Sequence, residues 1–318
     1  MKQYGYDEDE AINAIYEDGL RVYLTIDIDL QNKMDDIMKD HEYFEAGTYQ
    51  EEVSQLSEYD LPVYEKDGKT LKTSKDDDGN TVYYRYTSTE AAMVTMNYDG
   101  EVLAMTGGIG TKQATLGTNR ALDPHQTGSS IKPLGAYPLA IEYGLANYTT
   151  NIQDSYYYKA SDKKVVNVEY CLRNGLNPDP NDPNTKKHYG AFRNWPSNAS
   201  GRVTYANMPV YKALANSVNT IAVKLGSYVG ADILYDFQKN ILGFEYLVEE
   251  DADLGPLTLG SQSYGVTPLE EAAAYQILDG TGVYTTPHYY SKVTDSEGNT
   301  VIDMNRAVVE TQAISPST

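Results

Sequence analysis

The chain has 318 residues, with 46 acidic against 25 basic side chains, a net charge of −21 and a single cysteine. This length can bury a substantial core as one large domain with a smaller appendage. The negative charge argues against a nucleic-acid partner, whose phosphates need clusters of Lys and Arg, and against docking on anionic lipid. The lone cysteine, Cys171, excludes an internal disulfide.

Metal-site and membrane-span signals are missing from the sequence. The four histidines, His41, His125, His188 and His288, are scattered without the spacing of metal ligands. We therefore expect no metal and no other cofactor. No apolar run reaches the length of a membrane span, and no signal peptide opens the chain.

The N-terminal third is predicted to combine one helix with a few strands. The helix has apolar residues at helical spacing: Leu30, Met34, Ile37 and Met38. The expected strands cover residues 21–26, 91–96 and 101–106, of which the last two form a hairpin around 97–100. Residues 46–90 are an acidic, tyrosine-rich polar insert with a turn at Asp76-Asp77-Asp78-Gly79-Asn80.

The remainder of the chain is predicted to be mainly helical. A helix over 131–143 is ended by Gly144 and kinked at Pro138. After an irregular excursion at 150–205, further helical patterns cover 208–215, 219–229 and 231–242. Thr267-Pro268-Leu269-Glu270 combines a capping box with proline at the first helical position, opening a helix that ends before Gly280. The last element is a hairpin of residues 283–294 and 300–302 around 295–299.

The segment from Gln126 to Pro133 carries the clearest chemical signal. It places Ser129 three residues before Lys132 at the start of an apolar helical run, so both side chains lie on one helix face. Ser129 also lies at the positive end of the helix dipole, where free backbone N–H groups can face an oxyanion. Serine needs a base to become a nucleophile, and a desolvated, neutral lysine can be that base.

Two further polar motifs bear on this interpretation. Ser161-Asp162-Lys163-Lys164 repeats the Ser-x-x-Lys spacing, but it has no apolar helix behind it and indicates a solvated loop. Ser217 and Asn219 form the Ser-x-Asn motif of the chain, which can supply a proton-relaying hydroxyl and a substrate-holding amide. Alternatively, these two residues only cap the helix that begins near Thr220. Their combination with Ser129 and Lys132 favours the catalytic interpretation.

These motifs resemble those of the transpeptidase part of class A penicillin-binding proteins. The resemblance covers most of the chain and consists of ordered blocks: Gly19 to Asp27 with Leu30-Gln31, Asp99 to Gly108, Asn119-Arg120, Gly128 to Pro133, Ala213 to Val223, Leu259-Gly260, Val266 to Glu270, and Ala274-Tyr275 to Gly282-Val283-Tyr284. It implies an α+β fold in which an antiparallel sheet is flanked by helices, with an all-helical subdomain and the active site between them.

The resemblance also implies a function. Family members cross-link peptidoglycan as serine-type D-Ala-D-Ala transpeptidases or carboxypeptidases, through an acyl-serine intermediate, at the extracytoplasmic face of the bacterial membrane. It assigns Ser129 as nucleophile, Lys132 as base, Ser217 as proton relay and Asn219 as the amide that orients the substrate. The implied partners are stem peptides as acyl donor and amine acceptor, β-lactams as substrate mimics, and other cell-wall synthesis proteins.

One family motif is absent, because no Lys-Ser-Gly or Lys-Thr-Gly occurs in the chain. The resemblance therefore leads us to expect a fragment, incomplete for activity, that lacks the strand carrying this motif. The expected organisation is a linker at 1–45 that follows an absent glycosyltransferase domain, the polar insert at 46–90, and a partial transpeptidase domain at 91–318.

Two other functions remain as alternatives. The missing third motif would suit a catalytically impaired scaffold for cell-wall assembly, although a scaffold has no need of Ser129, Lys132, Ser217 and Asn219 together. The 30 tyrosines would suit a glycan-binding groove, for example at Tyr156-Tyr157-Tyr158 or Tyr289-Tyr290. Since the chain has only 4 phenylalanines, we favour the simpler explanation that tyrosine replaces phenylalanine on half-buried surfaces.

Overall fold

The computed structural model divides the chain into two compact units. The described residues are 7–17, 19–39, 49–56, 61–87, 90–110, 117–159, 165–166 and 193–318. Unit 1 comprises Met1–Ile26, Thr95–Leu103 and Leu122–Thr318, and unit 2 comprises Asp27–Val94 and Ala104–Ala121. The second Ser-x-x-Lys motif at 161–164, Cys171, His41, His188 and much of the predicted excursion at 150–205 lie outside the described residues.

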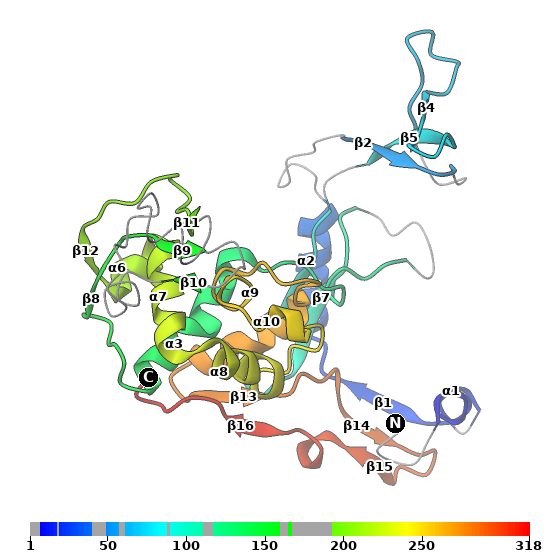
Figure 1. The fold of residues 1–318 in the computed structure, drawn as a ribbon. Helices are drawn as coiled ribbons and strands as arrows, with labels where there is room; N and C mark the ends of the chain where they lie inside the picture. The colour runs from blue at the N-terminus through cyan, green and yellow to red at the C-terminus, as the bar shows by residue number, and fades with distance from the viewer. Residues whose placement is uncertain are drawn as a thin grey trace. The chain divides into compact units, whose positions relative to one another are not determined.

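Unit 1 holds most of the helices (Figure 1). Its helical segments are α1 (Glu8–Tyr16), η3 (Gly128–Leu134), α3 (Ala136–Glu142), α6 (Val210–Ala215), α7 (Asn219–Val229), α8 (Ala231–Asp236), η4 (Phe237–Ile241), η5 (Glu249–Asp251), α9 (Leu254–Leu259), α10 (Pro268–Ala274), η6 (Tyr275–Leu278) and η7 (Met304–Arg306). Its strands are β1 (Arg21–Leu24), β8 (Asn151–Gln153), β9 (Tyr157–Lys159), β10 (Val165–Val166), β11 (Arg193–Trp195), β12 (Asn207–Pro209), β13 (Val283–Thr285), β14 (Tyr290–Thr294), β15 (Thr300–Asp303) and β16 (Glu310–Gln312).

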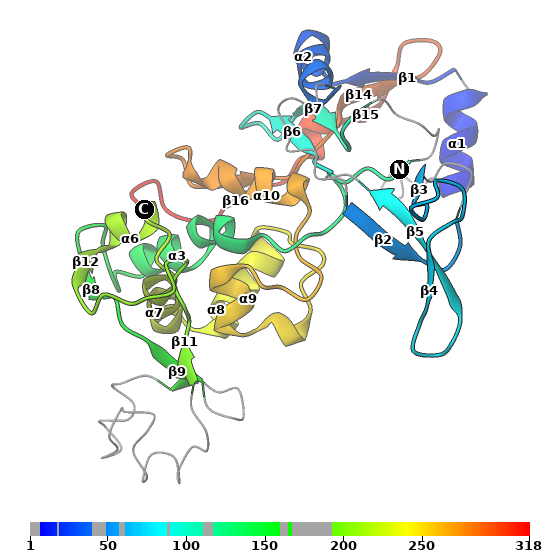
Figure 2. The same ribbon diagram turned by 90° about the horizontal axis from the view of Figure 1, so that it is seen from above.

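The core of unit 1 is built by helices that lie side by side in both ribbon views (Figures 1 and 2). Helix α7 packs against α3 and α9, and α9 packs against η3. Leu139, Ile221, Leu225 and Leu257 are each at most 2% exposed in this core. Burial of one such side chain contributes about 1.5–3 kcal/mol. The core therefore gives η3 a rigid support.

The predicted nucleophile helix is not one continuous helix, so that prediction was wrong. It is a 3₁₀ segment, η3, followed after Gly135 by α3. A Cβ at Gly135 would lie 2.5 Å from Nε2 of Gln238, so only glycine fits this close approach. The predicted kink at Pro138 is also wrong. Pro138 lies in the first turn of α3. Backbone N–H groups in a first turn make no hydrogen bond within the helix, so a proline there breaks none.

Other predicted helices are confirmed. α7 has the predicted bounds of 219–229, and α8 continues into the π segment η4 over most of 231–242. α10 begins with the predicted capping box, in which Thr267 accepts from the Glu270 N–H and the Glu270 carboxylate accepts from the Thr267 N–H. Helices α1 and α9 were not predicted. α9 has six residues and is too short to show a clear period. α1 opens with a capping box of Asp7 and Glu10, a local signal that the sequence interpretation overlooked.

Three β-turns in the structure are built in the same way. In each, Asp76, Asp295 or Asn97 accepts from the N–H groups two and four residues later with one side-chain oxygen. The residue three positions later is a glycine at positive φ, between 82° and 93°. Such Asx turns close a hairpin tightly. They confirm the predicted turns at 76–80, 97–100 and 295–299.

The C-terminal hairpin differs from the prediction in one respect. β14 and β15 pair around the predicted turn, and β1 pairs with the other side of β14. Residues 283–294 are not one strand, however, because Pro287 interrupts them. β13 pairs instead with β16. Proline lacks the N–H that a continuing strand would donate.

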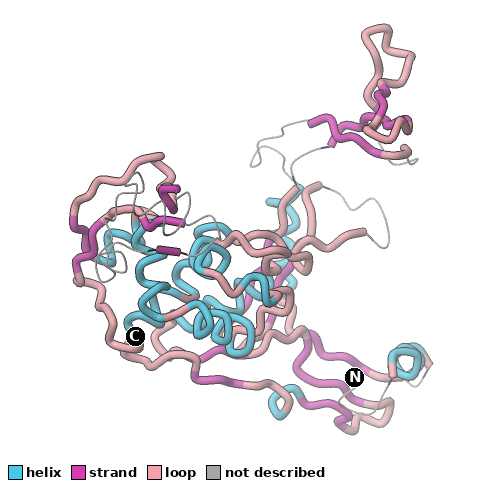
Figure 3. The backbone as a smooth tube through the Cα atoms, viewed as in Figure 1, coloured by secondary structure: helices cyan, strands magenta, loops and turns pink. Residues whose placement is uncertain are grey.

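Unit 2 contains α2 (Ile28–Lys39) and a small sheet, and the tube in Figure 3 shows its strands. Its strands are β2 (Tyr49–Val53), β3 (Leu61–Pro62), β4 (Thr73–Lys75) and β5 (Thr81–Thr87), and β6 (Met93–Met96) and β7 (Val102–Thr106) run from one unit to the other. The predicted helix is confirmed by α2, whose Met34 and Met38 pack with Ala104. No strand was predicted in the polar insert at 46–90, whereas β5 pairs there with β2, β3 and β4.

The fold class predicted from the sequence is confirmed. The structure combines helices with antiparallel strand pairs, as an α+β class requires. The predicted domain boundaries stay predictions. In the part of the chain that the structure describes, we find no helix long and apolar enough to cross a membrane.

Candidate active site

Ser129 and Lys132 lie one turn apart in η3. The Nζ atom of Lys132 is 3.1 Å from Oγ of Ser129. In a 3₁₀ segment, side chains at positions i and i+3 eclipse one another, so this geometry brings the pair closer than an α-helix would. Ser129 is exposed, whereas Lys132 is only 1% exposed. The hydroxyl is thus open to a substrate and the amine beneath it is not.

The neighbouring serine, Ser130, is oriented differently. Its hydroxyl donates to the carbonyl of Thr127 at 2.7 Å, and its own carbonyl accepts from the hydroxyl of Tyr275 at 2.7 Å. Ser130 therefore fixes the first turn of η3. Of the two adjacent serines, Ser129 is the one in contact with Lys132.

Ser217 reaches this pair from the turn between α6 and α7. The turn is a Schellman motif, in which Ser217 N–H donates to the Leu214 carbonyl and Val218 N–H to the Ala213 carbonyl. The position of Ser217 in this motif is usually glycine, because its backbone is left-handed. Ser217 has φ +52° there. The strained backbone turns both its hydroxyl and its carbonyl toward Lys132.

Lys132 is the centre of the cluster. Its Nζ lies 2.8 Å from the Ser217 carbonyl, 2.9 Å from Ser217 Oγ and 2.6 Å from Asn219 Oδ1, besides its contact with Ser129. None of these four acceptors is a carboxylate that would favour the charged ammonium. Burial lowers the pKa of Lys132 from 10.5 to about 8. The structure thus brings together all four residues singled out in the sequence.

Ser217 and Asn219 do not cap α7, so the capping interpretation is wrong. Asn219 is the first residue of α7, and the preceding Val218 makes no side-chain cap. The cap is supplied from another loop. Oδ1 of Asn198 accepts from the N–H groups of Asn219 at 3.0 Å and Thr220 at 3.3 Å. The side chains of the motif are therefore left free to face Lys132.

The loop at 260–265 supports the start of η3 and was missed as part of the site. Gln262 is fully buried, and its side chain contacts the side chain of Thr127 at 3.0 Å. Gly128 N–H donates to the Gly260 carbonyl at 3.1 Å. A Cβ at Gly260 would lie 2.1 Å from the oxygen of Gly128. Leu259-Gly260 was noted in the sequence as part of the family resemblance, but nothing in these two residues indicated that they contact the start of η3.

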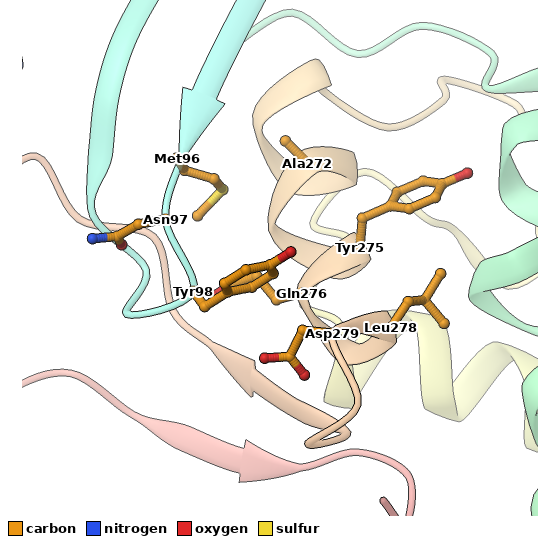
Figure 4. Close-up of a pocket in the computed structure, with 8 residues that line it drawn as sticks. All are labelled: Met96, Asn97, Tyr98, Ala272, Tyr275, Gln276, Leu278 and Asp279. Atoms are coloured by element: carbon orange, nitrogen blue, oxygen red, sulfur yellow. The ribbon is translucent and has the colours of Figure 1, made fainter.

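A separate pocket of about 300 Å³ lies beside η6 in unit 1. Figure 4 shows Met96 and Tyr98 facing Gln276 and Asp279, whereas the hydroxyl of Tyr275 points away from Tyr98. None of the four clustered residues lines this pocket. Among the described residues, no three His, Cys, Asp or Glu side chains lie close enough together to hold a metal ion.

Comparison with known proteins identifies the family. The profile of the penicillin-binding protein transpeptidase domain matches residues 90–318. The chain belongs to this family. The match covers both blocks that contain the clustered residues, so the resemblance stated from the sequence is confirmed.

Relatives within the family are similar over most of this chain. A penicillin-binding protein 1A of Clostridium botulinum is 28% identical over 305 residues, which are 95% of this chain and 30% of that protein. Penicillin-binding protein 4 of Bacillus subtilis is 30% identical over 206 residues, 64% of this chain and 27% of that protein. The chain thus spans about a third of the length of the curated relatives it matches.

Solved structures of this family show the same fold. PonA1 from Mycobacterium tuberculosis in complex with penicillin V has a TM-score of 0.59 at 19% identity, covering 99% of this chain and 64% of that one. Penicillin-binding protein 1A from Haemophilus influenzae has a TM-score of 0.55 at 17% identity, covering 95% of this chain and 54% of that one. At such low sequence identities the structural similarity shows a shared fold and nothing further.

Proposed function

We propose that the protein is a serine acyl transferase that cross-links peptidoglycan, with Ser129 as its nucleophile. The observation that carries the proposal is the buried Lys132 amine, in contact with two hydroxyls and an amide oxygen. A binding scaffold has no use for a desolvated amine below an exposed serine. Membership of the penicillin-binding transpeptidase family supports the same reaction class.

The acceptors around Lys132 dictate how a proton can move. A carbonyl and an amide oxygen only accept, so Ser217 O and Asn219 Oδ1 occupy two of the amine's hydrogens. The remaining site on the nitrogen faces the hydroxyls of Ser129 and Ser217. In the neutral amine this site is the lone pair, which takes the Ser129 proton. In the ammonium the site holds that proton, which Ser217 relays onward.

The reaction then proceeds in two steps. Ser129 Oγ forms a bond to the carbonyl carbon between the terminal D-alanines of a stem peptide, and the C–N bond of that peptide breaks. The proton taken by Lys132 passes through Ser217 to the leaving amine of D-alanine. An amine of a neighbouring strand next attacks the acyl-serine, forming the cross-link and returning a proton to Ser129. Water in place of the amine gives carboxypeptidase activity.

Two further groups assist these steps. Ser129 lies in the first turn of η3, where backbone N–H groups have no acceptor within the helix. Its N–H is therefore one hydrogen-bond donor for the oxyanion. Asn219 holds its amide in place by donating from Nδ2 to the Ser197 carbonyl at 2.7 Å. Its position beside Lys132 suits an amide that orients the substrate. This chemistry belongs at the extracytoplasmic face of a bacterial membrane, where peptidoglycan is assembled.

β-Lactams provide the test, because a strained cyclic amide that mimics the stem peptide acylates the same serine. In the intact protein, penicillin is expected to add one acyl group at Ser129, located by peptide mass mapping. Ser129→Ala abolishes the label, whereas the matched variant Ser130→Ala keeps it, since the Ser130 hydroxyl contacts a backbone carbonyl. Labelling that persists in Ser129→Ala contradicts the assignment, and a protein that never labels is the catalytically impaired scaffold.

A further inference from the structure

A second polar cluster lies behind the active-site residues, at the start of α7. Its centre is Asp154, which is 2% exposed and comes directly after β8. One carboxylate oxygen accepts from the Thr220 hydroxyl at 2.7 Å and from Asn198 Nδ2 at 2.9 Å. The other accepts from the N–H and the hydroxyl of Thr204 at 2.8 and 2.9 Å. All these donors lie 44 to 66 residues further along the chain.

The orientation of the Asn198 amide is fixed by these contacts. Nδ2 faces two acceptors, the Asp154 carboxylate and the Arg202 carbonyl, the latter at 3.0 Å. Oδ1 must therefore face the other way, where it accepts from the N–H groups of Asn219 and Thr220. A reversed amide would put an NH₂ group against two N–H donors, so Asp154 selects the orientation that caps α7.

The residue before Asn198 contacts the side chain of Asn219. The carbonyl of the preceding residue, Ser197, accepts from Asn219 Nδ2, and this contact turns Asn219 Oδ1 toward Lys132. One short segment, 197–198, thus holds both the backbone and the side-chain amide of Asn219. The segment is itself held by the buried carboxylate.

We propose that Asn198, oriented by Asp154, is a positioning residue that holds the Asn219 amide on Lys132. Neither residue touches the reacting atoms. The inference rests on the proposed function, because acylation of Ser129 is its main readout. Preorganised contacts matter in this setting, since a displacement of about 1 Å at a reacting centre can cost ~10²-fold in rate.

Lys224 strengthens the cluster from the far side. Its Nζ donates to the Gln153 carbonyl and to the Ser155 hydroxyl, both at 2.6 Å, so it holds the residues on either side of Asp154. Burial lowers the pKa of Lys224 to about 8, and the charge of Asp154 opposes this shift. Burial alone would raise the pKa of Asp154, but the hydrogen bonds from Thr220, Thr204 and Asn198 outweigh it and lower that pKa.

A double-mutant cycle tests the proposal in the intact protein. Rates of Ser129 acylation by a fluorescent penicillin are measured for Asn198→Ala, Asn219→Ala and the double variant. Asn198→Ala is expected to slow acylation ~10²-fold. Because Asn198 acts through Asn219, the double variant is expected to be within about threefold of Asn219→Ala rather than slower by the product of both effects. Multiplicative effects, or a normal rate in Asn198→Ala, would overturn the proposal.

Thr204→Ala is the matched control, because it removes a different hydrogen bond from the same carboxylate. It is expected to acylate within about twofold of wild type. If it slows acylation as much as Asn198→Ala, the cluster serves stability alone. Should Asn198→Ala not fold, Asn198→Ser, which keeps a capping oxygen, is measured in the same way.

A crystal structure of Asn198→Ala separates this inference from the proposed function. We expect Asn219 Oδ1 to move out of hydrogen-bond distance of Lys132 Nζ. If the wild-type protein is not acylated at Ser129, the proposed function fails while the crystal structure still tests the positioning. If wild type is acylated and Asn219 stays in place in the variant, the positioning role alone is wrong.

Discussion

At the scale of single residues, the cluster holds two side chains in states that are unfavourable by themselves. Ser217 has a left-handed backbone, which costs a non-glycine residue on the order of 1–3 kcal/mol. Lys132 has lost almost all contact with water, so its charge is destabilised. Strain of this kind persists only where the surrounding structure enforces it, and here the α6–α7 turn and the core below η3 do so.

The lowered pKa of Lys132 predicts how acylation depends on pH. Because the neutral amine takes the Ser129 proton, the acylation rate is expected to rise with pH through a midpoint near 8, well below the usual lysine value of 10.5. Lys132→Arg has no accessible neutral form and is expected to be at least ~10²-fold slower. Stopped-flow acylation by penicillin between pH 6 and 10 measures both effects. A rate that shows no midpoint below pH 10, or a fast arginine variant, contradicts the assignment of Lys132 as base.

The strain at Ser217 predicts a difference between two variants that both lack its hydroxyl. Ser217→Gly relieves the left-handed backbone and Ser217→Ala does not, so the glycine variant is expected to be more stable by about 1–2 kcal/mol. Both are expected to lose the proton relay and acylate ~10²-fold more slowly. Chemical denaturation and acylation kinetics measure the two effects. Equal stability would argue against the strain, and a normal rate in Ser217→Gly against the relay.

At the scale of elements, the sequence predicts what periodicity and local turn chemistry determine. α7 and the Thr267 capping box were predicted because their signals lie within a few residues. The break at Gly135 depends on Gln238, about a hundred residues away, and the cap of α7 depends on Asn198. Such tertiary contacts leave no local pattern. The contact between the side chains of Ser129 and Lys132 was therefore predicted from local spacing, whereas the 3₁₀ geometry of the segment that carries both was not.

The close contact between Gly260 and η3 predicts a specific effect on catalysis. Gly260→Ala would place a methyl group 2.1 Å from the Gly128 oxygen, which forces η3 to shift. Gly144→Ala is the matched control, because Gly144 has a similar positive φ but open space around it. Both variants are expected to lose about 1–2 kcal/mol of stability from the backbone alone.

The two glycine variants are expected to differ in rate. Only Gly260→Ala should slow acylation of Ser129, by ~10²-fold, because only there is the nucleophile displaced. Thermal denaturation and penicillin acylation of both variants provide the comparison. Similar rates in the two would show that the start of η3 tolerates the shift and that the loop at 260–265 has no positioning role.

At the scale of the whole molecule, all four clustered residues and their supporting contacts belong to unit 1. Unit 2 has its own small core of Met34, Met38 and Ala104 and its own sheet. β5 has seven residues rich in β-branched and aromatic side chains, a strand signal that the sequence interpretation overlooked. β3 and β4, with two and three residues, are too short to show the alternation of a half-buried strand. These short strands are held by backbone hydrogen bonds to β5, and such bonds leave no pattern of side chains in the sequence.

Because the clustered residues belong to unit 1, we expect a core substitution in unit 2 to lower stability without slowing acylation, and one in unit 1 to do both. Met34→Ala in unit 2 and Leu257→Ala in unit 1 each empty a buried site and are each expected to cost ~2–5 kcal/mol in their own unit. Leu257 lies in α9, which packs against η3, so its loss loosens the support of Ser129. Leu257→Ala is therefore expected to slow acylation as well as lower stability. Met34→Ala is expected to lower the stability of unit 2 and leave the acylation rate within about twofold. Calorimetry with penicillin acylation measures both, and a slow Met34→Ala variant would show that the active site depends on the core of unit 2.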